Sequence, residues 1–241
     1  NSGAFTNVDR AEKEKDLCSS INTQAPLIFA KFLKDQGGKF LQISTDYVFD
    51  GANNTPYKAN DSRNPLSHYG YSKAKAEEIL EKILSPNNQL VILRTSWLLS
   101  PSGKNFLFTM LNLHQKKKEI NVVSDQIGAM SSSFDVAKVC WEIVDNWDLI
   151  LRNHYINHWT CLGVLSWYDL AIEIGYLAKK YGIVEIPAKI KPITTAEYPT
   201  LAKRPNYSIL DCSDTQMVIK NSRTYWRYEL EEIILKIMSQ K

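Results

Sequence analysis

The segment Ser44–Gly51 (STDYVFDG) follows a short apolar run, and the segment Tyr69–Lys73 (YGYSK) begins 24 residues after Thr45. The run from Lys39 to Ser44 reads as a strand, and Tyr69 to Leu84 reads as a helix. Tyr69 and Lys73 are four residues apart, so they share one face of that helix and the ammonium can lie beside the phenol. The strand end adds a hydroxyl and a carboxylate.

These side chains suit proton transfer to or from a carbonyl oxygen. A free phenol titrates near pH 10, which is too high for efficient proton transfer at neutral pH. A neighbouring cation favours the phenolate, so we expect Lys73 to lower the pKa of Tyr69. With Thr45 and Asp46 at the strand end, the set predicts carbonyl reduction or alcohol oxidation at a nicotinamide cofactor.

The rest of the chain alternates between helix and strand patterns. Leu90 to Leu93 is a continuous apolar run, as in a parallel strand that is buried on both faces. Such alternation through the first 150 residues predicts an α/β fold with a doubly wound parallel sheet. We expect a dinucleotide-binding Rossmann-type domain over 1–150 and a smaller substrate-binding lobe over 151–241. The other expected helices are 16–36, 105–118, 133–146, 166–181 and 228–238, and the other expected strands are 120–123 and 186–193.

One expected part of a Rossmann domain is absent from the sequence. The 241 residues contain no G-x-G-x-x-G and do not begin with a strand followed by a glycine turn. A nucleotide-binding α/β fold normally starts with both. We therefore expect this chain to be a fragment that starts partway through the domain and lacks its first strand and glycine-rich turn.

Composition excludes several other classes of protein. The net charge of +3 is ordinary, and Lys116–Lys118, the one notable basic run, fits the end of a helix better than a nucleic-acid surface. No stretch approaches the roughly 18 apolar residues of a membrane span. The four cysteines and four histidines show no metal-ligand spacing, which favours reduced thiols, no metal site and a cytoplasmic location.

The motifs together resemble one known family. STDYVFDG at 44–51 and the correctly spaced YxxxK at 69–73 resemble dTDP-4-dehydrorhamnose reductase, of the extended short-chain dehydrogenases/reductases. The resemblance covers essentially the whole chain. Further matching segments are Asn1–Asp9, Asn64–Leu66, Leu93–Trp97, Gly103–Phe106, Asp125–Gly128, Tyr198–Thr200, Lys203–Pro205 and Ser208–Asp211.

The resemblance implies a role for individual residues. Tyr69 would be the catalytic acid, with Lys73 and Thr45 as its catalytic partners. Ala4, Phe5 and Thr6 would border the cofactor, together with Tyr69 and Lys73. Thr45, Asp46, Trp97 and Arg204 would contact the substrate, although Arg204 could equally pair with a carboxylate.

The implied reaction is the reduction of dTDP-4-dehydro-β-L-rhamnose to dTDP-L-rhamnose, the last step of dTDP-L-rhamnose biosynthesis. NADPH or NADH would supply the hydride, and the missing glycine turn leaves the choice between them open. The family also implies Mg²⁺ and a homodimer. Two alternatives stay open: another nucleotide-sugar epimerase or dehydratase, and a regulator like the β subunit of methionine adenosyltransferase.

Overall fold

The computed structural model of the chain describes residues 1–239, without the side chain of Asn153. The described residues form two compact units, and each unit is assembled from three segments of chain. The first unit contains 1–95, 138–159 and 200–222, and the second contains 96–137, 160–199 and 223–241. This interleaved division differs from the single boundary at residue 150 that the sequence predicts.

The first unit is built on a parallel sheet in the order β1-β2-β7, with β1 at Phe40–Thr45, β2 at Leu90–Thr95 and β7 at Ile156–His158. Thr45 lies opposite Thr95 in the register, and every residue of β2 is buried. Asn1 lies beside β1, where its carbonyl accepts a hydrogen bond from the backbone of Ile43 at 3.1 Å. The expected α/β class with a parallel sheet is confirmed.

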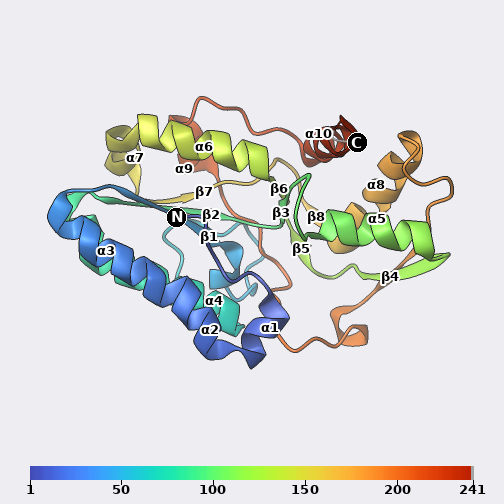
Figure 1. Cartoon of the computed structure of the whole chain (residues 1–241), viewed down its shortest axis with the longest axis horizontal. Coiled ribbons are helices and arrows are strands. Elements are labelled where there is room, and N and C mark those ends of the chain that lie inside the picture. The colour runs from blue at the N-terminus through green and yellow to red at the C-terminus, as the bar shows by residue number, and fades with distance from the viewer. Residues whose placement is uncertain (240–241) are drawn as a thin grey trace. The chain divides into compact units, whose positions relative to one another are not determined.

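Helices cover both faces of this sheet (Figure 1). α3 (Ala25–Gln36) and α4 (His68–Leu84) lie on one face, where Leu80 and Leu84 pack against Leu90 and Ile92. α6 (Ser133–Asp145) and α7 (Trp147–Asn153) lie on the opposite face. This arrangement is the doubly wound form that the alternating pattern predicts. The short helices are α1 (Val8–Lys13), α2 (Lys15–Ser19) and α9 (Ser213–Val218).

The helix expected over 16–36 is present but is not regular. A π-helical turn, Ser20–Gln24, separates α2 from α3. Pro26 sits in the first turn of α3. Proline has no backbone N–H and clashes with the preceding turn of a helix, so a wider turn before it accommodates the ring. Gly37 ends α3 in the left-handed conformation, with φ of 68°.

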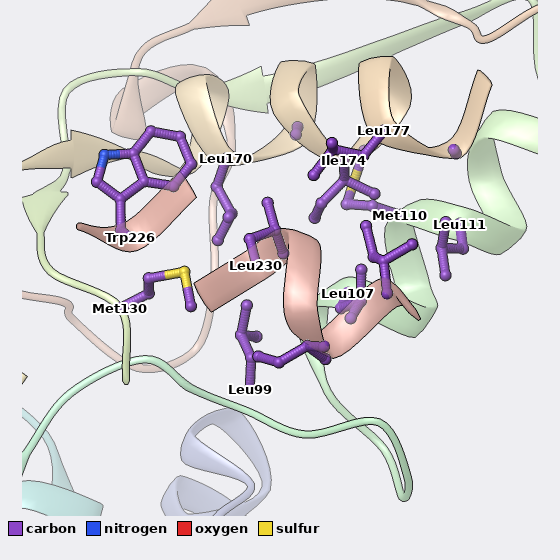
Figure 2. Packing of buried hydrophobic residues seen from close by; sticks show 14 of the residues in the cluster. Leu99, Leu107, Met110, Leu111, Met130, Leu170, Ile174, Leu177, Trp226 and Leu230 are labelled. Atoms are coloured by element: carbon purple, nitrogen blue, oxygen red, sulfur yellow. The ribbon is translucent and has the colours of Figure 1, made fainter. Parts of the chain in front are cut away.

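The second unit surrounds a helical core, shown in Figure 2. α5 (Phe106–Lys116), α8 (Trp167–Lys180) and α10 (Trp226–Ser239) contribute apolar side chains that are nearly all fully buried. Three short strand pairs complete this unit: β3 (Leu98–Leu99) with β6 (Ser131–Ser132), β4 (Glu119–Val123) with β9 (Lys189–Ile193), and β5 (Ile127–Gly128) with β8 (Leu165–Ser166).

The caps of the helices agree in part with the sequence. Ser166 caps α8 through a capping box with Asp169. Ser133 is the first residue of α6, as the expected helix over 133–146 predicts. Within residues 1–239, no helix is both long enough and apolar enough to cross a membrane. All four cysteines are free thiols, and three of them are buried.

Candidate active site

The carboxyl end of β1 presents Thr45 and Asp46. The chain turns there into a single 3-10 turn, Asp46–Val48, which the Thr45 side chain caps by accepting a hydrogen bond from the Tyr47 backbone at 3.2 Å. The Thr45 hydroxyl in turn donates to Asp46 Oδ1 at 3.0 Å. The carboxyl ends of parallel strands are where α/β folds bind their ligands.

α4 brings Tyr69 and Lys73 to this strand end. The helix begins at His68, and Ser67 caps it by accepting from the Gly70 backbone at 3.2 Å. A Cβ on Gly70 would collide with the Tyr47 carbonyl oxygen, so glycine is what lets the first turn of α4 come so close to the 3-10 turn. The Tyr69 ring then meets the Tyr47 ring edge-on, with 5.6 Å between their centroids.

Tyr69, Thr45 and Asp46 lie together at this strand end. The Thr45 hydroxyl donates to Asp46 Oδ1, and it lies close enough to the Tyr69 phenol to lower the pKa of that phenol. Asp46 is 1% exposed, and its second oxygen, Oδ2, has no hydrogen-bond partner in the described structure. The Ser208 hydroxyl favours the charged form of this carboxylate. A buried acceptor without a partner is costly and fits a place where a ligand donates.

Burial shifts the pKa of each group in the site. Desolvation raises the pKa of Asp46 to about 6 and the pKa of Tyr69 to about 12. Desolvation also lowers the pKa of Lys73 to about 8. The sequence predicts that Lys73 lowers the pKa of Tyr69, and this is wrong for the structure, because the loss of water around the phenol dominates.

Lys73 is directed at the strand rather than at solvent. Its Nζ donates to the Ile43 carbonyl at 2.7 Å, and the residue is 4% exposed. An ammonium has three N–H donors, so this bond leaves two for other groups.

The loop Ala4–Thr6 is fixed by a side chain that the sequence analysis did not single out. Asn22 accepts from the Phe5 backbone N–H at 2.7 Å and donates to the Phe5 carbonyl at 3.1 Å. It also donates to the hydroxyl of Ser72, the residue before Lys73, at 3.0 Å. Phe5 is buried in a cluster against which Tyr69 packs. Asn22 therefore ties this loop to the helix that carries Tyr69 and Lys73.

Arg204 has a carboxylate partner, which was one of the two alternatives for it. Its Nη2 donates to Asp9 Oδ2 at 2.5 Å, and its Nη1 donates to Thr200 Oγ1 at 2.6 Å. Asp9 also accepts from the Ala202 backbone at 3.1 Å. Although burial alone would raise the pKa of Asp9, the hydrogen bond from Arg204 lowers it. A contact between Arg204 and substrate stays a prediction.

A second group that sequence reasoning missed lies one turn after Lys73. Glu77 is fully buried and accepts from Arg94 Nη2 at 2.7 Å and from Arg63 Nε at 2.5 Å. Burial alone would raise the pKa of Glu77, but the two guanidiniums lower it to about 2. Both residues could have been found as charged positions within apolar patterns. Glu77 lies on the buried face of a helix, and Arg94 lies within a buried strand.

A cavity lies beside Glu81, near the C-terminal end of α4. It has a volume of about 660 Å³ and is lined by polar and charged groups that include Arg63, Glu81 and Arg94. Its lining does not include Thr45, Tyr69 or Lys73. Trp97 belongs to the second unit, where its ring stacks on Trp167 with 3.6 Å between centroids.

A hydroxyl at the end of a parallel strand, beside a helix with tyrosine and lysine four residues apart, defines an oxidoreductase of the short-chain dehydrogenase/reductase class. Residues 1–239 match the family model described as the RmlD substrate binding domain. The chain is 39% identical over 234 residues to dTDP-4-dehydrorhamnose reductase of Aggregatibacter actinomycetemcomitans, covering 97% of this chain and 79% of that protein. The chain therefore belongs to the dTDP-4-dehydrorhamnose reductase family.

Solved structures of relatives have the same fold. The crystal structure of a dTDP-4-dehydrorhamnose reductase from Clostridium acetobutylicum superposes with a TM-score of 0.88 at 36% identity, over 98% of this chain and 79% of that one. The enzyme from Bacillus anthracis, solved in complex with NADP, gives a TM-score of 0.86 at 31% identity. That match covers 97% of this chain and 78% of the other.

Proposed function

We propose that this protein reduces dTDP-4-dehydro-β-L-rhamnose to dTDP-L-rhamnose with NAD(P)H, as the final step of dTDP-L-rhamnose biosynthesis. The observation that carries the proposal is the grouping of the Tyr69 phenol with the Thr45 hydroxyl and the Asp46 carboxylate at the end of β1, with Lys73 four residues along the same helix. Family membership supplies the identity of the sugar, and the site supplies the groups for the proton transfer.

The protein's part of this reaction is to supply a proton and to stabilise charge at the keto oxygen. The nicotinamide supplies the hydride when it is bound. Tyr69 gives its proton to the oxygen as charge develops there. Burial raises the pKa of Tyr69 to about 12, so the phenol carries its proton at neutral pH, and the charge that develops on the keto oxygen draws this proton away. Thr45 and Lys73 stabilise the developing charge by hydrogen bonding and by electrostatic attraction.

The residues present fit the nicotinamide end of the cofactor. Lys73 has donors left over, and the Tyr69 phenol lies in the same packed cluster as Phe5. We propose that Ala4, Phe5, Thr6, Tyr69 and Lys73 border NADPH or NADH. The B. anthracis relative was solved with NADP, but no residue of this chain is assigned to the cofactor's 2′ position. Among residues 1–239 no cluster of His, Cys, Asp or Glu could hold a metal ion, so we propose no ligands for Mg²⁺ and no part for it in the reaction.

For the substrate we propose contacts from Thr45, Asp46, Trp97 and Arg204. The free Oδ2 of Asp46 suits a sugar hydroxyl, which can donate to it. Arg204 pairs with Asp9, and the positive charge of its guanidinium would attract a diphosphate. We further propose that the first unit binds the dinucleotide and that the protein is a cytoplasmic homodimer.

The experiment that tests this function compares two tyrosines of one motif. Tyr69→Phe should retain the fold and substrate binding and lose at least about 100-fold in kcat, because the proton donor is gone. Tyr71→Phe removes a phenol that is 54% exposed, and it should leave the rate within about twofold. Oxidation of NADPH on addition of dTDP-4-dehydrorhamnose gives the rate.

The same assay separates the alternatives. An epimerase or dehydratase would turn over its sugar nucleotide without net oxidation of NADPH. A regulator like the methionine adenosyltransferase β subunit would co-purify with a synthetase and show no reductase activity. A Tyr69→Phe protein with a rate near that of the wild type would remove Tyr69 from the mechanism.

A further inference from the structure

His158 lies at the end of β7, in the first unit, and its imidazole is enclosed. The residue is 1% exposed, and it is opposite Arg94 of β2 in the sheet register. The Phe49 ring lies nearly perpendicular to the imidazole, with 6.0 Å between the centroids. The proposed reaction gives His158 no part, although burying polar nitrogens is costly unless they are hydrogen-bonded.

Both ring nitrogens of His158 have partners that fix their roles. Nε2 lies 3.2 Å from Nη1 of Arg94, and Nδ1 lies 3.1 Å from the backbone carbonyl oxygen of Asp211. A guanidinium in a protein only donates, so Nε2 must accept and carries no proton. A carbonyl oxygen only accepts, so Nδ1 must carry the proton. His158 is therefore neutral, and it is the Nδ1–H tautomer.

A charge on His158 would be unfavourable. Burial, and after it the Arg94 guanidinium, lower the pKa of His158 to about 3. Protonation of Nε2 would remove an acceptor from Arg94 and would place two cations side by side in the interior. The neutral form is thus the one that this position favours at physiological pH.

The Nε2 acceptor extends the hydrogen bonding of Arg94 beyond its ion pair. Nε and Nη2 of Arg94 donate to the Glu77 carboxylate at 3.1 Å and 2.7 Å, and Nη1 donates to the Ala59 carbonyl at 3.1 Å. His158 accepts from the same Nη1. Because the guanidinium is planar and its donors point in fixed directions, the acceptors on the Nη1 side orient the side that meets Glu77.

Glu77 connects Arg94 to α4. It lies one turn after Lys73 and two turns after Tyr69 on that helix. Glu77 and Arg94 are both fully buried, so a shift of the guanidinium has no loose side chain or solvent to absorb it. The placement of α4 against β1 and β2 therefore depends in part on an acceptor in a third strand, β7.

We propose that His158 is a positioning residue for the reaction. In its neutral Nδ1–H form it accepts from Arg94 and thereby holds the guanidinium against Glu77. The position of α4, and with it that of Tyr69 and Lys73, is maintained in this way. This inference rests on the proposed function and adds to it a residue that acts through Arg94 and not by contact with the cofactor or the substrate.

Nitrogen NMR of the wild-type chain tests the tautomer directly. Long-range nitrogen–proton correlation spectra distinguish a ring nitrogen that carries a proton from one that does not. At pH 7.5 His158 should be the Nδ1–H form. His114 should be the opposite, Nε2–H form, because its Nε2 lies 3.0 Å from the Ala171 carbonyl oxygen. A His158 spectrum with the proton on Nε2, or on both nitrogens, would overturn the inference.

Two amide variants separate positioning from packing. In His158→Gln the amide reaches the place of Nε2 and can accept from Arg94, whereas in His158→Asn the shorter amide reaches only the place of Nδ1 and Asp211. His158→Asn should lower kcat about three- to thirtyfold, with a smaller change in the KM for NADPH, because small misplacements of reacting groups are costly. His158→Gln should restore kcat to within about threefold of the wild type. Rates are taken per folded molecule.

His154→Gln is the control in the same segment of chain. The His154 side chain is 57% exposed and lies 3.8 Å from Asp214, so kcat should stay within about twofold. Equal kcat of His158→Asn and His158→Gln, at any level, would mean that packing alone explains His158 and would overturn only this inference. A wild-type chain that does not oxidise NADPH with the keto sugar overturns the proposed function, and the positioning role with it.

Discussion

At the scale of single residues, Asp46 is buried in a state that lowers the stability of the folded protein. Its carboxyl is 1% exposed, and only Oδ1 has a hydrogen-bond donor, Thr45. Burial raises its pKa from 3.8 to about 6, so the folded state disfavours the carboxylate that exists at neutral pH. Such a cost is tolerated where a substrate later supplies the missing donor.

Asp46→Asn should therefore stabilise the free protein while reducing its activity. The penalty begins as pH rises above 3.8 and is complete above about 6, so the variant should gain about 1–3 kcal/mol of unfolding free energy at pH 7.5. Urea denaturation followed at pH 7.5 and at pH 4.5 measures the gain, which should shrink at the lower pH. The amide keeps the shape but loses a charged acceptor, and kcat/KM should fall at least about tenfold.

Asp50 is the matched control in the same segment. Hydrogen bonds from the Ala52 backbone, Tyr57 and Asn64 lower its pKa, which is the opposite direction to Asp46. Asp50→Asn should thus destabilise the protein at pH 7.5. A loss of stability in both variants would show that Asp46 is an ordinary structural carboxylate.

At the scale of elements, α4 is fixed to two neighbouring strands by charged groups. Lys73 donates to the backbone of β1, and Glu77, one turn later, pairs with Arg94 of β2. Arg94 also donates to the Ala59 carbonyl at 3.1 Å, and Arg63 pairs with the same glutamate. The position of Tyr69 over Thr45 thus depends on a buried ion group that lies outside the site.

Glu77→Gln should be one of the most destabilising conservative changes in the chain. It leaves the buried Arg94 without its anion, which costs roughly 3–5 kcal/mol in comparable cases. The pKa of Glu77 is lowered to about 2, so its contribution is present above pH 4.5 and is lost as pH falls toward 2. The free energy of unfolding in urea at pH 7.5 gives the magnitude.

Glu78→Gln, at the next position of α4, is the control. Glu78 makes an exposed pair with Lys75, and its loss should cost under about 0.5 kcal/mol. If the Glu77→Gln and Glu78→Gln proteins were equally stable, water would be compensating the buried charge of Arg94. The buried ion group would then not fix the position of α4.

The sequence predicted a residue of these elements where its signal lies within a short stretch of chain. Thr45, Tyr69 and Lys73 were found because a strand end and an i, i+4 spacing are visible in a short window. Asn22 was not found, because its contacts with Phe5 and Ser72 join residues that are 17 and 50 positions away. β7 was missed because Ile156–His158 has no apolar run and is a strand only through its pairing with β2.

At the scale of the whole chain, the sequence predicted elements better than it predicted their grouping. Apolar periodicity marks which face of a helix is buried, but it does not say which partner covers that face. Segments 138–159 and 200–222 join the first unit, although both flank 160–199, which joins the second. A single boundary at residue 150 would cut through both groups.

This interleaving predicts that residues 1–150 do not fold alone. That piece would lack β7, which pairs with β2, and the backbone bond from Tyr57 to the Ile209 carbonyl at 2.8 Å. It would also lack Arg204, the partner of Asp9, and it would separate α5 from α8 and α10, whose side chains form one core. Thermal melting followed by near-UV circular dichroism should show a cooperative transition for the full chain and none for 1–150. The transition should return when 1–150 and 151–241 are co-expressed. A cooperative melt of 1–150 by itself would mean that the N-terminal part has a self-sufficient core and that the boundary at 150 is the physical one.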